Sequence, residues 1–248
     1  MLKILFDGDM LLFRASASCE REIKWDDEIW TLHSDAKEVK AKFDEMVLTY
    51  ADNAMQKMKY EGEYQYIICF TSPNSFRKKL LPSYKENRKD KRKPLAYYNV
   101  LRWVKENYKC VEADGLEADD CIGIMATLYA QSSVIISGDK DFKTIPGLFY
   151  DFIHNELHII NKVEADYWHL YQTLVGDTTD NYKGCPKVGA VSAKRLLEKY
   201  PTWQTVVQAY EKAGLSEHEA LIQARVARIL RAEDYDLKTK EIILWSPV

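Results

Sequence analysis

Two acidic stretches contain the residue types that could do chemistry. Glu117, Asp119 and Asp120 stand at the start of an apolar segment with a helix pattern, and Asp139 and Asp141 follow an apolar segment with a strand pattern. Five carboxylates brought together would repel one another, and folding alone gives no reason to gather them. A hard divalent cation, which binds oxygen ligands, would remove that cost. The alternative is purely structural, since acidic residues favour the first turn of a helix and aspartate often ends a strand at a turn.

Two further stretches could join this set of acids. Asp7 directly follows an apolar run at residues 2–6, with Asp9 two positions later. Asp177 and Asp180 are three positions apart and could lie on one face of a turn, although aspartate is also a common cap and turn residue. Together the four stretches predict a metal site built from carboxylates.

The apolar segments of about the first 150 residues alternate between strand and helix patterns. Strands are expected at residues 2–6, 64–70, 109–112 and 133–137, helices at 10–17, 36–60, 94–108 and 121–130, and a hairpin at 148–153 and 157–160. This alternation predicts an α/β fold with a mainly parallel central sheet flanked by helices. Sites in such sheets form beyond the carboxyl ends of the strands, where Asp7 and Asp139 are both expected to lie.

The pattern changes after residue 162. Helices are expected at residues 163–175, 189–199, 202–213 and 216–232, and the tail at 240–245 is apolar enough to pack back on the body. We therefore expect an α/β core of residues 1–162 and a helical module of residues 163–248.

A basic strip follows the second expected strand. Residues 77–93 contain nine Lys and Arg against Glu86 and Asp90, so the strip carries +7 and the rest of the chain −10. Four aromatic residues lie in it or beside it: Phe76, Tyr84, Tyr97 and Tyr98. Cations contact phosphates and aromatic rings stack on unpaired bases, so the strip indicates a nucleic-acid partner unless it is only a solvated charged loop.

A glycine-bearing turn at residues 184–189 precedes the helix expected at 189–199. Backbone N–H groups at such a turn can hold a phosphate without reading a base, and Lys187, Lys194 and Arg195 would add positive charge.

Composition excludes several other classes. The chain of 248 residues is 46% hydrophobic and 29% charged, and no apolar run approaches the roughly 20 residues of a membrane helix. Its start lacks a secretory signal pattern, and its five cysteines include no CxxC motif, so neither a disulfide framework nor a zinc site is expected. These features predict a protein of the reducing cytoplasm.

The motifs and their order resemble the 5′-nuclease (flap endonuclease) family, and most closely the short phage 5′→3′ exonucleases. The resemblance rests on Asp7-Gly8-Asp9, Phe76-Arg77-Lys78, Tyr84-Lys85-Glu86-Asn87-Arg88, Glu117-Ala118-Asp119-Asp120, Gly138-Asp139-Lys140-Asp141-Phe142, Gly176-Asp177-x-x-Asp180-Asn181 and Gly184-x-Pro186-x-x-Gly189. It spans about residues 3–200, and each motif is weak alone while their order and spacing are specific.

The resemblance implies a two-metal phosphodiesterase with an α/β core, a basic helical arch at about residues 76–98 and a helix–three-turn–helix module. Its cofactors would be two Mg²⁺ ions, replaceable by Mn²⁺, with a K⁺ ion in the 176–190 region. Its substrate would be DNA with 5′ ends, flaps or gaps, or RNA–DNA hybrid, and the chain would be a monomer.

The resemblance also implies a role for each matching residue. Glu117, Asp119 and Asp120 would serve the first metal, Asp139 would lie between the metals, Asp141, Asp177 and Asp180 would serve the second, and Asp7 would act nearby. In the arch, Lys85 and Arg88 would engage the scissile phosphate, Tyr84 would stack on a base, and Arg77, Lys78 and Lys89 would contact DNA. Gly184, Lys187, Gly189, Lys194 and Arg195 would grip the duplex backbone.

One departure from the family concerns the strand before the arch, which is usually followed by an aspartate. Here residues 69–76 contain no acid, and Thr71 or Ser72 occupies that position. Asp9 could compensate, or it could equally cap the helix that follows it.

Two other functions are compatible with parts of this pattern. A phosphatase could use Asp7 and Asp9 as an Asp-x-Asp motif, with the acids at 176–180 holding magnesium, but the acids at 117–120 and 139–141 and the basic strip would then have no role. A DNA-junction-binding protein without catalysis would keep the basic strip and explain the missing aspartate.

Overall fold

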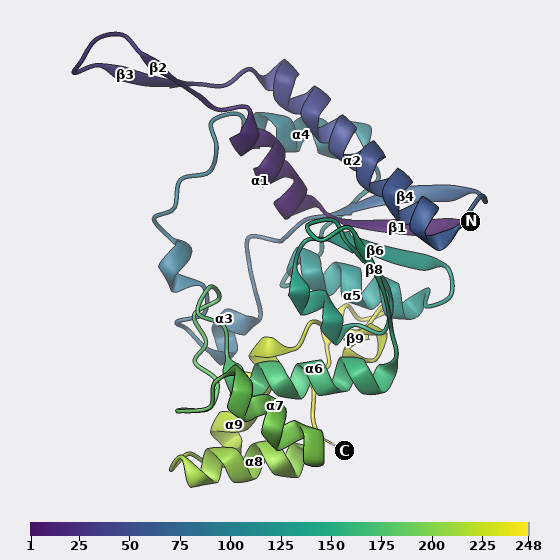
Figure 1. The fold of residues 1–248 in the computed structure, drawn as a ribbon, viewed down its shortest axis with the longest axis vertical. Helices are drawn as coiled ribbons and strands as arrows, with labels where there is room; N and C mark the ends of the chain where they lie inside the picture. The colour runs from purple at the N-terminus through teal and green to yellow at the C-terminus, as the bar shows by residue number, and fades with distance from the viewer. Residues whose placement is uncertain (248) are drawn as a thin grey trace.

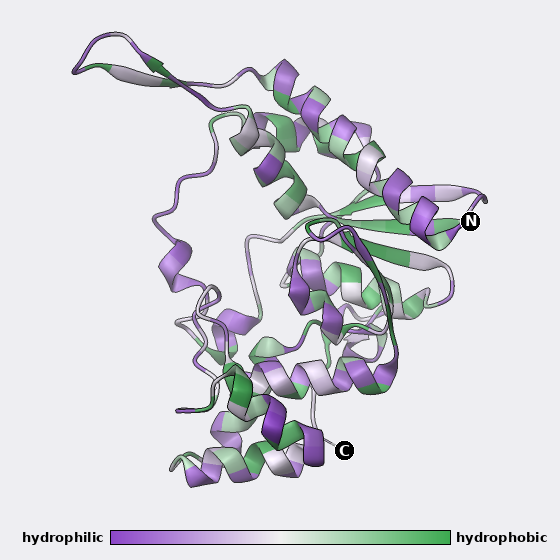
Figure 2. Cartoon of the chain, in the orientation of Figure 1, coloured by the Kyte–Doolittle hydropathy of each residue, from purple (hydrophilic) through white to green (hydrophobic). Residues whose placement is uncertain are grey.

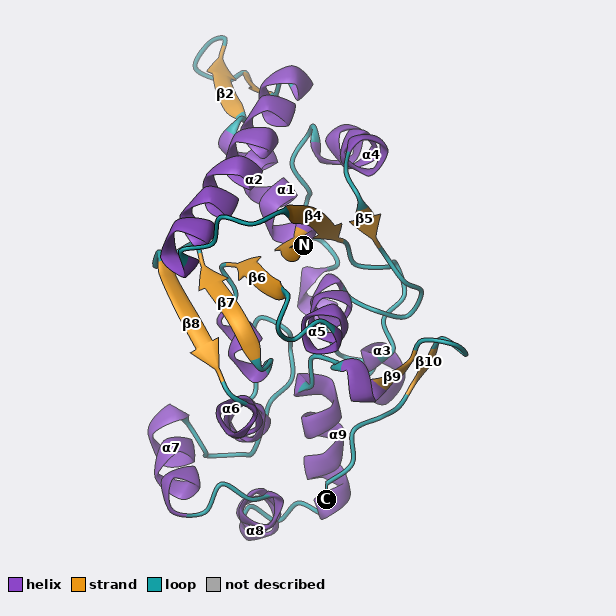
Figure 3. Ribbon diagram, turned by 90° about the vertical axis from the view of Figure 1, so that its right-hand side faces the viewer, coloured by secondary structure: helices purple, strands orange, loops and turns teal. Residues whose placement is uncertain are grey.

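The computed structural model describes residues 1–247 and is built on a six-stranded sheet with the order β5-β4-β1-β6-β7-β8 (Figures 1 and 3). The strands are β1 (Leu2–Asp7), β4 (Tyr64–Cys69), β5 (Cys110–Val111), β6 (Ser133–Ser137), β7 (Gly147–Asp151) and β8 (Glu156–Ile160). All neighbours are parallel except the β7–β8 hairpin, whose turn places Asn155 at a φ of 55°. The predicted α/β fold with a mainly parallel sheet is confirmed.

Helices cover both faces of this sheet. Helices α1 (Gly8–Ser18), α2 (Ala36–Met58) and α4 (Tyr97–Asn107) cover one face, and α5 (Ala118–Leu128) covers the other. Alternate side chains of β1 serve the two layers, with Ile4 and Phe6 in the first core and Leu5 in the second. Because the central strands are buried on both faces, they read as continuous apolar runs in the sequence.

Four helices follow the sheet: α6 (Lys162–Val175), α7 (Ala190–Lys199), α8 (Trp203–Lys212) and α9 (Glu217–Ala227). They share a separate apolar cluster that includes Leu174, Leu197 and Tyr210. In the tail, the half-buried Ile242 and Leu244 pack against the second core, which includes Cys121 and Ile122 of α5. None of the helices in residues 1–247 is long and apolar enough to span a membrane.

The basic strip forms little regular structure. It contains the short helix α3 (Arg77–Leu80) and a 3₁₀ turn, η1 (Glu86–Arg88), and residues 81–96, which we call the strap, otherwise run as irregular chain to α4. The strap is largely hydrophilic (Figure 2). The predicted helix start at Pro94 was wrong, because residues 94–97 form a turn in which the Tyr97 N–H donates to the Pro94 carbonyl.

Two other elements differ from expectation. Helix α9 ends at Ala227 rather than at residue 232, because the chain turns inward at Arg228 and Arg231. There the Arg228 guanidinium and the Arg231 backbone N–H both donate to the Asp234 carboxylate. Two short hairpins were not predicted: β2 (Arg21–Lys24) with β3 (Trp30–His33), and β9 (Tyr235–Asp236) with β10 (Glu241–Ile242). The remaining 3₁₀ turns are η2 (Lys140–Thr144) and η3 (Ala232–Asp234).

Candidate active site

Asp7 and Asp139 meet at the carboxyl edge of the sheet because β1 and β6 are parallel neighbours. One oxygen of Asp7 accepts from the Met10 N–H at 3.0 Å and thereby caps α1, and the other accepts from the Ser137 hydroxyl at 3.2 Å. The Ser137 oxygen in turn accepts from the Asp139 N–H at 3.1 Å. Ser137 therefore links the two acids; its only signal in the sequence is its place at the end of a strand just before Gly138.

Asp119, from the first turn of α5, joins these two acids. Burial raises the pKa of Asp119 well above its usual range, and the charges of Asp7 and Asp139 raise it further. The pKa of Asp7 rises to about 7, mainly because its carboxyl is buried. Burial also raises the pKa of Asp139, with added repulsion from Asp180 and Asp177. These carboxyls are therefore buried and close enough for their negative charges to repel one another.

Asp141 lies beside Asp139 and faces the acids of the 176–184 loop. Its N–H donates to Asp139 at 2.9 Å, and its pKa rises to about 7 because of burial and of the charges on Asp139 and Asp177. One oxygen of Asp141 is buried without a hydrogen-bond partner. The loop that carries Asp177 and Asp180 is closed by paired backbone bonds between Asp177 and Tyr182.

This donor set suits hard divalent cations. It consists of carboxylate oxygens, several of them buried, mutually repelling and, at Asp141, lacking a partner. Among residues 1–247, no three His, Cys, Asp or Glu side chains are placed so that they could hold a metal ion together. The acids therefore line the site from several elements without converging on one point.

Two cations of the strap lie among the acids. The Lys85 ammonium bonds to Glu117 and lies 3.5 Å from an oxygen of Asp180, and Arg88 forms an ion pair with Asp180. Burial alone would raise the pKa of Glu117, but the charges of Arg77 and Lys85 outweigh burial and hold that pKa at about 2. The structure thus brings together Lys85, Arg88 and the acids, which lie far apart in the sequence.

Asp120 and Arg77 form a structural ion pair, contrary to the predictions for both. The Arg77 guanidinium, 3% exposed, donates twice to Asp120 at 2.7 Å and once to the Arg228 carbonyl at 2.6 Å. The Glu117 and Leu230 N–H groups also donate to Asp120. Both Asp120 oxygens are therefore fully engaged and unsuited to metal, and Arg77 is too buried to contact DNA.

The structure also contradicts the DNA contacts expected of Tyr84 and Gly184. The Tyr84 ring is buried against Tyr182, and its hydroxyl donates to Asp180 at 2.9 Å, so the ring cannot stack on a base. Gly184 is buried with its N–H bonded to Gln223, and its positive φ of 63° lets the chain pass close to Gly176. It shapes the loop and does not face solvent.

The remaining predicted DNA contacts are exposed: Lys78, Lys89, Lys187, Lys194, Arg195 and Gly189. Gly189 is the N-cap of α7, and no atom lies within 4 Å of the place where a side chain would begin. The first turn of α7 is therefore open to a phosphate. Lys89 is paired with Glu86 on the strap.

The carboxylate of Asp9, from the first turn of α1, lies just beyond the end of β4, where residues 69–76 lack an acid. Its carboxylate accepts from the Thr71 N–H at 2.9 Å and from the Tyr97 hydroxyl at 3.1 Å. Asp7, and not Asp9, caps α1. Of the two roles considered for Asp9, capping is excluded, and a carboxylate beside Asp7 is what the geometry shows. Nothing in the sequence indicated the contact between Tyr97 and Asp9 beyond the place of Tyr97 after the basic strip.

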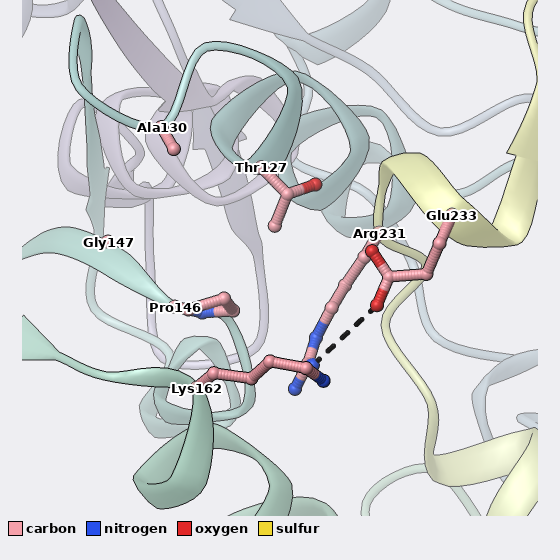
Figure 4. Close-up of a pocket in the computed structure, with 7 residues that line it drawn as sticks. All are labelled: Thr127, Ala130, Pro146, Gly147, Lys162, Arg231 and Glu233. Carbon is pink, nitrogen blue, oxygen red and sulfur yellow. Dashed lines mark ion pairs between the residues drawn. The ribbon is translucent and has the colours of Figure 1, made fainter. Parts of the chain in front are cut away.

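A cavity elsewhere in the fold is separate from these acids. It measures about 250 Å³ and is lined by Thr127, Ala130, Pro146, Gly147, Lys162, Arg231 and Glu233 (Figure 4). It lies where β7 begins, away from the carboxyl edge, and none of the acids of the candidate site lines it.

Known proteins share this sequence pattern and this fold. Residues 3–165 match the family model of the 5′-3′ exonuclease N-terminal resolvase-like domain. The chain is 32% identical to the exodeoxyribonuclease of Enterobacteria phage T3, over 98% of this chain and 92% of that protein, and 32% identical to the exonuclease of Escherichia phage T7, over 98% and 93%. The solved structure of the phage T5 5′-exonuclease with bound divalent zinc shares the fold, with a TM-score of 0.66 at 15% identity over 91% of this chain and 88% of that one. The chain therefore belongs to the 5′-3′ exonuclease family.

Proposed function

We propose that this chain hydrolyses phosphodiester bonds of DNA from 5′ ends and at 5′ flaps, with divalent metal ions as cofactors. The observation that carries the proposal is the buried carboxylate cluster at the sheet edge, with Lys85 and Arg88 of the strap placed directly over it. The phage T3 and T7 relatives are named as an exodeoxyribonuclease and an exonuclease, and a solved T5 relative is named as a flap endonuclease with DNA and metal ions.

The acids that surround the cluster would hold the metal ions once Lys85 and Arg88 leave Glu117 and Asp180 for a phosphate. Asp119 and Glu117 would serve one ion, Asp139 would serve both, and the acids on its far side would serve the other: Asp141, Asp177 and Asp180. Two cations, Mg²⁺ or Mn²⁺, would supply charge for the phosphate, an activated water and help for the leaving oxygen. K⁺ at residues 176–190, cleavage of RNA–DNA hybrids and a monomeric state remain predictions.

Lys85 and Arg88 would bind the scissile phosphate. In the free protein they neutralise Glu117 and Asp180, so substrate binding would exchange a carboxylate partner for a phosphate partner. This exchange would release the carboxylates at the moment when DNA arrives. The positive charges of Lys85 and Arg88 would also stabilise the negative charge that develops on the phosphate.

The exposed start of α7 would bind the duplex away from the reacting bond. Its open first turn offers N–H groups, and Lys187, Lys194 and Arg195 add charge. Contacts of this kind position DNA without reading its sequence.

The geometry does not favour a phosphatase. Both oxygens of Asp7 already accept hydrogen bonds, and so do both oxygens of Asp9, which leaves no obvious nucleophile. The acids at 117–120 and 139–141 would also have no role in that reaction.

A polarity assay tests the proposal. Duplex DNA labelled at either end should be digested from the 5′ end in Mg²⁺, and a chelator should stop the reaction. Asp119→Asn should lower the rate by orders of magnitude while DNA affinity holds, and Glu61→Gln, an exposed acid between α2 and β4, is the matched control. Digestion from 3′ ends, or DNA binding without cleavage, would refute it, and the second result would favour a junction-binding protein.

A further inference from the structure

The hairpin β2–β3 projects from the body beside α1 and α2 (Figure 1). Every residue from 21 to 31 is exposed, so the hairpin has no core of its own. An isolated two-stranded hairpin is marginally stable in water. Its turn is nevertheless well defined, because the Asp26 carboxylate accepts from the Glu28 N–H at 2.8 Å and from the Ile29 N–H at 2.7 Å.

One face of this hairpin is apolar. Strand pairing places Ile23 opposite Thr31, and the Trp25 N–H donates to the Ile29 carbonyl, so all four side chains share one face. The Trp25 indole N–H donates to the Thr31 hydroxyl at 2.8 Å. The large apolar members, Ile23, Trp25 and Ile29, are 36%, 67% and 54% exposed. We call these three residues the hairpin face.

Exposed apolar side chains gathered on a projecting element need a reason. Single exposed apolar residues are ordinary, but a contiguous patch with a polar border is typical of a binding surface. Rigid aromatic anchors such as Trp25 are also the residues that carry most of the energy of protein interfaces.

The charges around the hairpin face select the kind of partner. Residues 21–33 contain four acids against Arg21 and Lys24. Both cations are already paired, Arg21 with Glu38 on α2 and Lys24 with Asp27 at 2.6 Å. No cation within residues 21–33 is therefore free for a phosphate, and the acidic tip would repel DNA.

We propose that the hairpin face docks a protein partner whose binding groove is apolar and bordered by Lys and Arg. The base of the hairpin is tied to the strap, since Glu20 pairs with Arg92 and accepts from the Leu95 N–H at 2.6 Å. A partner bound here is held next to the strap. The site is distinct from the carboxylate cluster and does not depend on catalysis.

Binding of defined peptides to the full chain tests this. Synthetic peptides of alternating leucine and lysine represent the partner, and peptides with glutamate in place of lysine are their acidic counterparts. By fluorescence anisotropy, the basic set should bind more tightly than the acidic set. The double change Trp25→Ser with Ile29→Ser should weaken that binding about tenfold or more, and Glu28→Gln should weaken it severalfold.

Ile159→Ser is the matched control, because Ile159 is 79% exposed on β8 and lies outside the hairpin. It should leave peptide binding unchanged, and all variants should cleave plain DNA at the normal rate. Equal binding of basic and acidic peptides, or equal binding by the double variant, overturns the proposal. So does loss of oligothymidylate affinity in the double variant, which would make the face a base-stacking surface. If the wild-type protein is a dimer and the double variant is a monomer, the hairpin face is a self-association surface instead.

Discussion

Crowding of the buried acids should make the stability of the metal-free protein fall as the pH rises. The pKa values of Asp7 and Asp141 both rise to about 7, from 3.8 in the unfolded chain. Between about pH 4 and pH 7 the folded protein then binds more protons than the unfolded chain, so its stability is lost as the pH increases through that window. A divalent cation among the acids should restore the lost stability at neutral pH.

The size of the effect follows from the shifts. A change of about three pKa units corresponds to about 4 kcal/mol for one carboxyl. Asp7 and Asp141 both interact with Asp139, so their titrations are linked, and we expect about 4 kcal/mol for the two together. In a chain of this size that amounts to roughly 10 °C in melting temperature.

Thermal melting in chelator and in millimolar Mg²⁺ measures this. The gain from Mg²⁺ should be large at about pH 7.5 and small at about pH 5. Asp141→Asn should raise the melting temperature of the metal-free protein at the higher pH and reduce the gain from Mg²⁺. Glu61→Gln, an exposed acid far from the cluster, should change neither. A metal-free melting temperature that is constant across this range, with equal Mg²⁺ gains, would refute the idea that the acids repel one another.

Three other variants test separate parts of the site. Tyr84→Phe keeps the ring but loses the hydroxyl that bonds Asp180, so the single-turnover rate should fall about tenfold at unchanged DNA affinity; an unchanged rate would remove Tyr84 from the site. Asp9→Asn should raise the Mg²⁺ concentration for half-maximal rate about tenfold if Asp9 replaces the missing acid after β4, and an unchanged titration would show that it does not. Lys194→Ala should weaken DNA binding and reduce the salt slope of log Kd by about one, while the rate at saturating DNA holds; a lost rate at normal affinity would contradict this role.

The sheet could be predicted because its strands are buried on both faces and are therefore apolar throughout. The β2–β3 hairpin could not, since its exposed strands carry a mixture of charged and apolar residues with no buried face to impose an alternation. The end of α9 at Ala227 could not be predicted either. Nothing in the sequence shows that Arg228 and Arg231 leave the helix to bond inside the fold.

The acids of residues 117–120 show how far spacing can go. Glu117 is the N-cap of α5, and Asp120, three positions later, bonds back to the Glu117 N–H in a capping box. The structural alternative for acids at a helix start was therefore right for Asp120. It was not sufficient for Asp119, which lies between them and turns toward Asp7 and Asp139. Spacing identified the group of acids, and only the direction of each side chain separated a helix cap from a candidate ligand.

In the strap, too, neighbouring side chains point to different places. Tyr84 is buried and Lys85 reaches the acids because Lys85 adopts a φ of 53°, a left-handed conformation that costs a lysine roughly 1 kcal/mol. No sequence pattern predicts this conformation for a lysine. Its ammonium compensates by pairing with Glu117 and Asp180, two acids that come from different parts of the chain. In the free protein the strap is therefore held in place by the same carboxylates that it would have to release when a phosphate binds.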